Sequence, residues 1–176
     1  RIYGITGDNG MGKSTFIRLI AGLCMPDSGN IYIDDIEIKK YNVEYLRKHI
    51  GYLLQKPLLL RGKNPIDNID TKRMMRYFNM GKKRYLEENV KGLSGGESQK
   101  LALAYLLSDK TKDIYILDEP TASVDLKSEE VICSQIRDAL KGKTALIITH
   151  RRSILKICDE VIDFNKEVSY KNVRKM

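Results

Sequence analysis

The chain reads Gly7-Asp8-Asn9-Gly10-Met11-Gly12-Lys13-Ser14-Thr15, which fits G-x-x-x-x-G-K-S, the P-loop or Walker A pattern. The apolar, β-branched run at residues 2–6 predicts a buried strand just before it. The apolar run at 16–21 predicts a helix just after it. Because strand, glycine-rich loop and helix follow in the order that the pattern requires, we prefer a phosphate site to an ordinary glycine-rich turn.

Each residue type in this loop suits a nucleoside triphosphate. The glycines let backbone N–H groups turn inward without a Cβ in the way, and the positive end of the following helix completes an anion site. We expect Lys13 to reach the β- and γ-phosphates and the Ser14 hydroxyl to bind Mg²⁺. The nucleotide-binding residues predicted here are Asp8, Asn9, Gly10, Met11, Gly12, Lys13, Ser14 and Thr15.

Length and composition limit the class of protein. With 176 residues the chain suffices for one domain with a core, and it has no apolar run of the ~18 residues that a membrane span needs. The formal net charge of +8 suits nucleic acid or an anionic membrane face, although we prefer dispersed, solvated lysines. Cys24, Cys133 and Cys158 lack metal-ligand spacing and are expected to be reduced cysteines of a cytosolic protein.

The remaining pattern predicts an α/β fold. A hairpin is expected at 31–33 and 36–38, helices at 43–48, up to 107, at 128–140 and at 153–157, and strands at 50–54, 113–117, 144–148 and 161–164. This alternation predicts a mostly parallel sheet covered on both faces, with a small antiparallel hairpin region. Residues 57–92 are interpreted as short helices whose methionines and aromatics form a small core.

A candidate catalytic pair ends the strand expected at 113–117. Ile114-Tyr115-Ile116-Leu117-Asp118 is an apolar run followed by Asp, which fits the Walker B pattern. Ligands bind at the carboxyl ends of strands in such sheets, so Asp118 is expected to hold Mg²⁺ through water. Glu119 is placed to orient and polarise the attacking water. The alternative, that Asp118 caps the next helix, is disfavoured by the P-loop upstream.

A second candidate phosphate site is Leu93-Ser94-Gly95-Gly96-Glu97-Ser98-Gln99, which precedes an apolar helix. A capping box explains Ser94 and Glu97. It does not explain two glycines in the first turn, where each costs up to ~1 kcal/mol of helix stability. We therefore interpret the segment as a phosphate-binding helix N-terminus that a second copy of the chain could supply in trans.

Together these segments resemble the nucleotide-binding domain of an ABC ATPase over nearly the whole chain. The stretch 93–97 is similar to the family's signature motif L-S-G-G-Q, with Glu in the last place, and lies between a Walker A and a Walker B. The resemblance implies a P-loop NTPase core at 1–55 and 109–176 and a helical subdomain at 56–108 that carries the signature. It also implies a head-to-tail dimer, of identical or paired domains, with ATP and Mg²⁺ between the subunits.

The resemblance also implies roles for single residues. Gln55 is similar to the Q-loop glutamine, which senses Mg²⁺ and the γ-phosphate and couples to the transport domain. His150 is similar to the switch histidine that contacts the γ-phosphate, and it follows a predicted strand at the edge where Asp118 emerges. The implied catalytic residues are Glu119, His150 and Gln55, and the implied metal ligands are Ser14, Gln55 and Asp118. The residues implied to contact the partner's nucleotide are Ser94, Gly95, Gly96 and, from the D-loop at 123–125, Asp125.

The sequence departs from the family in three places. Only residues 1–6 precede the P-loop, so we expect a fragment or excised domain that lacks the adenine-stacking aromatic and its N-terminal strands. The stretch between Gln55 and the signature is shorter than the family's usual helical subdomain. Lys56 stands where the family often has an acidic residue.

Three uses of such a domain remain open. We expect a motor domain at the cytoplasmic face of the cell membrane, bound to a transmembrane domain and without stable nucleic-acid binding. The exporter type is favoured because 58–69 resembles the segment after the exporter Q-loop, although the segment before the signature fits poorly. A soluble ABC ATPase acting on ribosomes or DNA suits the positive charge, but the chain has no heptad run. A degenerate domain without turnover is disfavoured because Lys13, Asp118, Glu119 and His150 are all present.

Overall fold

The computed structural model describes residues 1–56, 73, 75–76, 78, 80 and 94–166. At its centre is a five-stranded sheet in the order β4-β5-β6-β1-β7, whose neighbouring strands all run parallel. The strands are β1 (Ile2–Thr6), β4 (Ile50–Leu53), β5 (Ile114–Asp118), β6 (Thr144–Ile148) and β7 (Glu160–Asp163). The predicted, mostly parallel sheet is confirmed.

The predicted hairpin is also confirmed, as a separate antiparallel pair of β2 (Tyr32–Ile33) and β3 (Ile36–Glu37). Its two-residue turn holds Asp34 at φ 49° and Asp35 at φ 60°. Positive φ at both turn residues matches the twist of a tight hairpin, and Asp tolerates this region better than most residues. The second strand is shorter than expected, because Ile38 begins a 3₁₀ turn, η1 (Ile38–Lys40).

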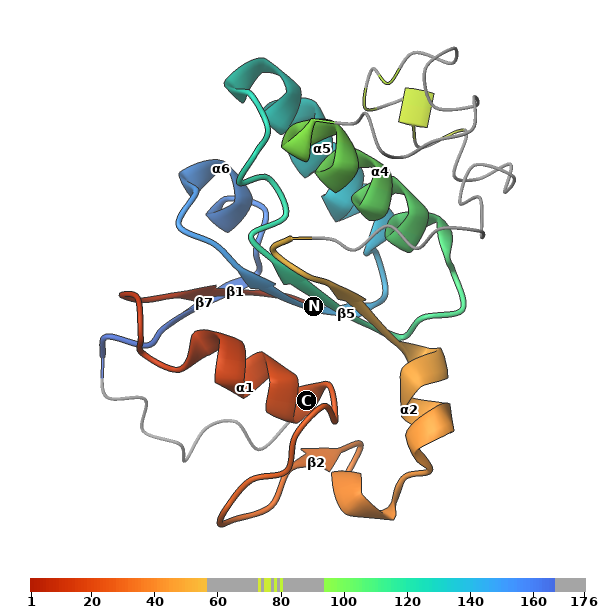
Figure 1. Cartoon of the computed structure of the whole chain (residues 1–176), viewed down its shortest axis with the longest axis vertical. Helices are drawn as coiled ribbons and strands as arrows, with labels where there is room; N and C mark the ends of the chain where they lie inside the picture. The colour runs from red at the N-terminus through yellow and green to blue at the C-terminus, as the bar shows by residue number, and fades with distance from the viewer. Residues whose placement is uncertain (57–72, 74, 77, 79, 81–93, 167–176) are drawn as a thin grey trace.

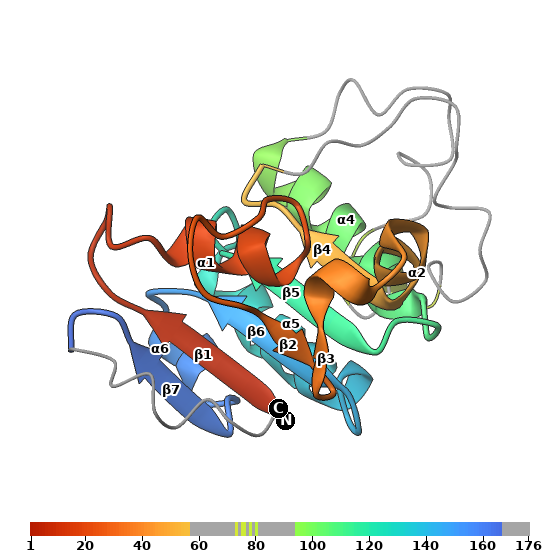
Figure 2. The same cartoon turned by 90° about the horizontal axis from the view of Figure 1, so that it is seen from below.

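Helices cover both faces of the sheet (Figures 1 and 2). On one face lie α4 (Gly95–Ser108), α5 (Leu126–Ala139) and α6 (Arg152–Leu155), and on the other lie α1 (Lys13–Ile20) and α2 (Val43–His49). The central strands β5 and β6 are almost entirely apolar, as expected for strands buried on both faces, apart from Thr144 at the start of β6 and Asp118 at the end of β5. None of the helices in the described parts of the chain is long and apolar enough to cross a membrane.

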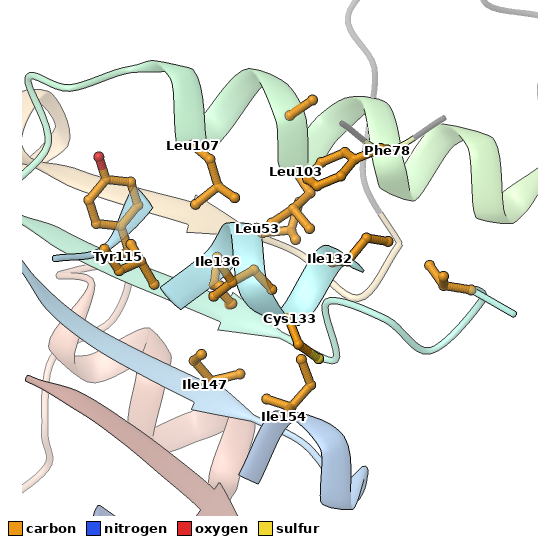
Figure 3. Close-up of a cluster of buried hydrophobic side chains, with 14 of the residues drawn as sticks. Leu53, Phe78, Leu103, Leu107, Tyr115, Ile132, Cys133, Ile136, Ile147 and Ile154 are labelled. Carbon is orange, nitrogen blue, oxygen red and sulfur yellow. The ribbon is translucent and has the colours of Figure 1, made fainter. Parts of the chain in front are cut away.

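The core is divided by the sheet into two clusters. The cluster under α4 and α5 contains Leu103, Leu107, Ile132 and Ile136 packed on strand residues such as Tyr115 (Figure 3). Among residues 57–92, the described members of this cluster are Met75, Phe78 and Met80, all buried. These side chains are buried, as expected of core residues, but they join the main cluster and do not form a separate small core. The other predictions for 57–92 lie outside the described residues.

Capping side chains fix where the helices begin. Asn42 accepts hydrogen bonds from the N–H groups of Glu44 and Tyr45 at the start of α2. The Asp125 carboxylate accepts one from Ser128 N–H, so α5 begins at Leu126, two residues earlier than predicted. The helix cap after β5 is thus Asp125, which rules out the alternative that Asp118 caps that helix. Helix α6 begins one residue earlier and ends two residues earlier than the predicted 153–157.

The parallel arrangement brings the predicted motifs to one edge of the sheet. The P-loop follows β1, Gln55 follows β4, Glu119 follows β5 and His150 follows β6. The register pairs Ile5 of β1 and Asp118 of β5 with the same β6 residue, Ile148. The carboxyl ends of these strands therefore converge, as a ligand site in an open α/β sheet requires.

Candidate active site

The P-loop forms an open cradle between β1 and α1. Gly10 (φ 86°) and Gly12 (φ 83°) adopt left-handed backbone angles that other residues rarely reach. Apart from their chain neighbours, no atom of the described residues lies within 4 Å of a Cβ built at either position, so no other described element fills the space next to these two glycines. The first turn of α1 carries no acidic side chain that would compete for this space. The loop therefore fits the phosphates of a nucleotide.

Lys13 lies inside this cradle. Its side chain is 7% exposed, and its ammonium donates to the carbonyl oxygens of Gly7 (2.5 Å) and Asp8 (2.7 Å). Those two bonds hold a positive charge inside the loop, where phosphate oxygens would lie. Ser14 and Thr15 follow at the start of α1 and are exposed, so their hydroxyls are free to face a ligand.

Asp118 and Glu119 emerge beside the P-loop at the end of β5. Burial raises the pKa of the Asp118 carboxyl, and the positive charges of Arg18 and Lys13 oppose that rise. Burial likewise raises the pKa of Glu119, against the lowering effects of His150 and of a hydrogen bond from Thr149. A carboxylate with a raised pKa is a stronger proton acceptor, which suits a general base.

His150 and Thr149 surround the Glu119 carboxylate. His150 Nε2 lies 3.8 Å from Glu119 Oε1, and Thr149 Oγ1 donates to Oε2 over 3.4 Å. The Glu119 side chain is 13% exposed and the His150 side chain 51% exposed. The structure thus brings together Lys13, Asp118, Glu119 and His150. Gln55 is exposed two residues beyond β4, at the same edge of the sheet.

Sequence reasoning missed two polar residues of this site. Arg18 on α1 carries a positive charge that acts to lower the pKa of Asp118 and also acts on Tyr52 of β4. Thr149 contacts the carboxylate of Glu119. Thr149 could have been suspected from its position next to His150, but no sequence pattern connects Arg18 with Asp118.

The signature segment (94–97) begins α4 with the capping box that the sequence predicted. Ser94 N–H donates to Glu97 Oε2 (2.8 Å), and Glu97 N–H donates to Ser94 Oγ (3.2 Å). The two glycines differ in their surroundings. A Cβ at Gly96 would lie 2.4 Å from the backbone oxygen of Ser123 in the D-loop, whereas a Cβ at Gly95 would lie 3.9 Å from its nearest atom, Ser123 Oγ. Gly96 is therefore required for the close approach of the D-loop to α4.

We predict that Gly96→Ala lowers the free energy of unfolding by ~1–3 kcal/mol, because the new methyl group meets a backbone carbonyl that has no flexible end to move. Gly95→Ala is the matched control. It adds the same methyl group to the same turn without a clash and is expected to be neutral or stabilising by up to ~1 kcal/mol. Urea unfolding of the two variants measures the difference, and equal stability would contradict the contact between α4 and Ser123.

A partly buried ion pair also holds the D-loop (123–125). Arg151 Nη1 lies 2.9 Å from Glu129 Oε2, and Glu129 is 3% exposed. The same guanidinium donates to the backbone oxygens of Ala122 (3.0 Å) and Val124 (3.2 Å). Thr121 Oγ1 donates to the second oxygen of Glu129 (2.9 Å). Arg151, which directly follows His150, is thereby joined to the backbone on either side of Ser123.

Stability should depend on pH through Glu129. Burial raises the pKa of Glu129, but hydrogen bonds from Ser153, Thr121 and Arg151 lower it more, so the net shift is downward. A lowered folded-state pKa gives stability that is present above the unfolded value of about 4.3 and is lost as pH falls through the folded value.

We predict that Glu129→Ala lowers the free energy of unfolding by ~3 kcal/mol near neutral pH, because it leaves Arg151 without its partner. The variant should also lose less stability than wild type as the pH falls. Thermal unfolding between neutral and acidic pH tests this, with the exposed neighbour Glu130→Ala as control. Matching profiles for the two variants would refute the assigned ion pair.

Comparisons with known proteins agree with this geometry. The sequence model of the family described as ABC transporter matches residues 1–122. P-glycoprotein 14 of Caenorhabditis elegans is 32% identical over 184 residues, an alignment that covers 93% of this chain and 14% of the relative. The alpha-hemolysin translocation ATP-binding protein HlyB of Escherichia coli is 32% identical over 184 residues, covering 94% of this chain and 26% of the relative. The chain thus spans only a small part of these relatives.

Two solved structures have a similar fold. The dimeric ATP-binding cassette MJ0796, in a post-hydrolysis state bound to ADP and Pi, superposes with a TM-score of 0.76 and 26% identity, covering 92% of this chain and 80% of that one. A bacterial Atm1-family ABC exporter with ATP bound gives a TM-score of 0.77 and 25% identity, covering 92% of this chain and 31% of that one.

Proposed function

The chain belongs to the ABC transporter family and is an ATP-binding domain of that family, and from this premise we propose that it is the ATP-hydrolysing motor of a membrane exporter. The observation that carries the proposal is the placement of Glu119, a largely buried carboxylate next to His150, at the strand edge that also bears Lys13 and Asp118. The names of HlyB, a translocation protein, and of the Atm1-family exporter support the direction of transport.

We propose the following roles for the site residues, which their positions support. Lys13 and the P-loop N–H groups bind the β- and γ-phosphates, and Glu119 orients the attacking water and accepts its proton. His150, within reach of Glu119, fixes that carboxylate and contacts the γ-phosphate. Ser14, Asp118 and Gln55 would hold Mg²⁺, which would supply positive charge to the phosphate oxygens.

The chain's side chains suit magnesium in particular. Within the described residues, no group of three or more His, Cys, Asp or Glu side chains could enclose a metal ion. Mg²⁺ does not need such a cage, because it is usually bound by one or two carboxylates together with substrate phosphates and water. Asp118 beside an open P-loop provides that arrangement.

The proposed partner is a second nucleotide-binding domain, identical or paired, in a head-to-tail dimer. Ser94 and Gly95 are exposed at the start of α4 and so are open to a nucleotide held by another chain. Gly96 and Asp125 are proposed to contact the same nucleotide. We propose that a transmembrane domain docks near Gln55 and that this domain lies at the cytoplasmic face of the membrane.

The alternative of a soluble ATPase on ribosomes or DNA gains no support from the described residues. Several of their lysines pair with carboxylates at different places on the surface, as Lys112 does with Asp109 and Lys141 with Asp138. Lysines that are paired in this way contribute less positive charge to a nucleic-acid surface than unpaired ones do. We therefore expect no stable binding to nucleic acid.

Trans-complementation tests the dimeric motor. Lys13→Ala disables a P-loop, and Ser94→Arg blocks a signature segment, so neither variant alone should hydrolyse ATP. In a mixed head-to-tail dimer, one site combines the intact P-loop of one chain with the intact signature of the other. We expect the mixture to regain ATPase activity that neither variant has alone. Absence of any recovery would overturn the head-to-tail arrangement.

The membrane part of the proposal has its own test in the native polypeptide and the genes next to its own. Several apolar runs of about 20 residues, joined to this domain or encoded beside it, would support a transporter. A native protein that copurifies with no membrane component would overturn the exporter assignment, whatever its ATPase activity.

A further inference from the structure

Gln99 is a buried polar residue that the proposed mechanism does not use. It lies on the second turn of α4 and is only 1% exposed. Its side-chain Nε2 donates to the backbone oxygen of Glu119 (2.5 Å), and its Oε1 accepts from the backbone N–H of Ser123 (3.0 Å). One amide therefore joins the helix of the signature segment to the candidate general base and to the D-loop.

The backbone of Glu119 needs such support. Its φ is 49°, in the left-handed region that is unfavourable for a residue with a Cβ. Its N–H donates to Ile148 O (2.9 Å), and its carbonyl accepts from Ala122 N–H (3.1 Å) as well as from Gln99. Because the direction of the carboxylate depends on these backbone angles, a bond to the Glu119 carbonyl helps to set where the carboxylate points.

The contacts between α4 and Ser123 of the D-loop are equally specific. Gln99 accepts the Ser123 N–H, while Gly96, three residues earlier on α4, leaves room for the Ser123 carbonyl. The first turns of α4 thus hold both backbone polar groups around one D-loop residue. Any shift of α4 must move Ser123 and Glu119 with it or break these contacts.

We propose that Gln99 is a positioning residue that holds the Glu119 carboxylate in its productive direction. The inference rests on the proposed role of Glu119 in ATP hydrolysis. Gln99 itself touches neither nucleotide nor water in this scheme and acts through the Glu119 backbone. An amide suits the task because it offers a donor to a carbonyl and an acceptor to an N–H at the same time.

The chemistry of the amide suggests a direct test by pH. Gln99→Glu keeps the shape, but an ionised carboxylate cannot donate to the Glu119 carbonyl. A protonated carboxyl can, and burial raises the pKa of such a group. Both proteins contain Glu119 and His150, so the ratio of variant to wild-type kcat at each pH isolates the new carboxyl.

We expect the kcat ratio for Gln99→Glu to approach one at acidic pH and to fall about 10- to 100-fold as pH rises, because small displacements of a reacting group have effects of this size. Gln99→Met, which removes both bonds, should show a similar loss at every pH. Binding of a fluorescent ATP analogue should stay within about twofold of wild type for both variants, since the P-loop is unchanged.

The half-buried Gln135 on α5 provides the matched control. The kcat ratio of Gln135→Glu to wild type should stay near one at every pH. If the kcat ratio for Gln99→Glu does not change with pH, whatever its value, the hydrogen-bond argument is overturned. This outcome is decisive even if Gln99→Met fails to fold. Wild-type kcat in Gln99→Met overturns the positioning role. If the wild-type protein itself does not hydrolyse ATP, the proposed function fails instead.

Discussion

Replacement of Glu119 with Gln is expected to lower kcat for ATP hydrolysis by about 10²- to 10⁴-fold, because the amide keeps the shape of the side chain but cannot accept a proton. Glu119 is well suited to act as the base, since burial raises its pKa. Wild-type activity should therefore rise with pH through a value above that of an ordinary glutamate. The variant should lose this rise together with its activity.

Binding should survive in the same variant. None of the bonds that hold Lys13 in the P-loop involves Glu119, so ATP affinity should remain near that of wild type. With hydrolysis blocked, bound ATP should persist and hold the dimer together, which light scattering in the presence of Mg-ATP would detect. Glu130→Gln, on the exposed face of α5, should behave as wild type. Full hydrolysis by the Glu119 variant would exclude Glu119 as the base.

The edge of the sheet that carries the site could be predicted from sequence because two local signals combine. Continuous apolar runs marked β1, β5 and β6, and the polar residue after each run marked its carboxyl end. Since parallel strands place those ends at one edge, Lys13, Asp118 and His150 had to converge. The capping box at Ser94 is a similarly local pattern.

The contacts that stabilise the site could not be predicted, because they join residues far apart in the chain. Gln99 reaches Glu119, Arg151 reaches Glu129, and Arg18 approaches Asp118 only after the sheet has formed. The glycine at Gly96 was interpreted as room for an anion, but the structure shows that it also accommodates the Ser123 carbonyl. Sequence patterns identify residue types at a local spacing and carry no information on such packing.

The functional assignments of Asp125 and of the signature residues remain predictions for the same reason. In the isolated chain the Asp125 carboxylate caps α5, and Ser94 Oγ accepts the Glu97 N–H. Both side chains therefore already have a structural role. Contact with a partner's nucleotide would have to add to these bonds or replace them.

Replacement of Lys13, the P-loop lysine, is expected to have the second large effect, a loss of affinity for ATP. Its ammonium is nearly buried and is held by two backbone carbonyls, so it is already desolvated and directed before a nucleotide arrives. A charge that is already desolvated and directed acts more strongly on a phosphate than a fully solvated lysine does. Thr15 and Ser14 cannot replace it, because a hydroxyl carries no charge.

We expect Lys13→Ala to raise the Kd for Mg-ATP by about 100-fold or more, which corresponds to about 3 kcal/mol of lost electrostatic stabilisation. Isothermal titration with a slowly hydrolysed ATP analogue measures the effect. Lys141→Ala is the charge-matched control, because Lys141 is exposed on the loop after α5 and pairs only with Asp138 among the described residues. Equal affinity in both variants would refute the P-loop assignment. A loss confined to Lys13→Ala, with thermal unfolding unchanged, would show that the charge inside the cradle binds the phosphates.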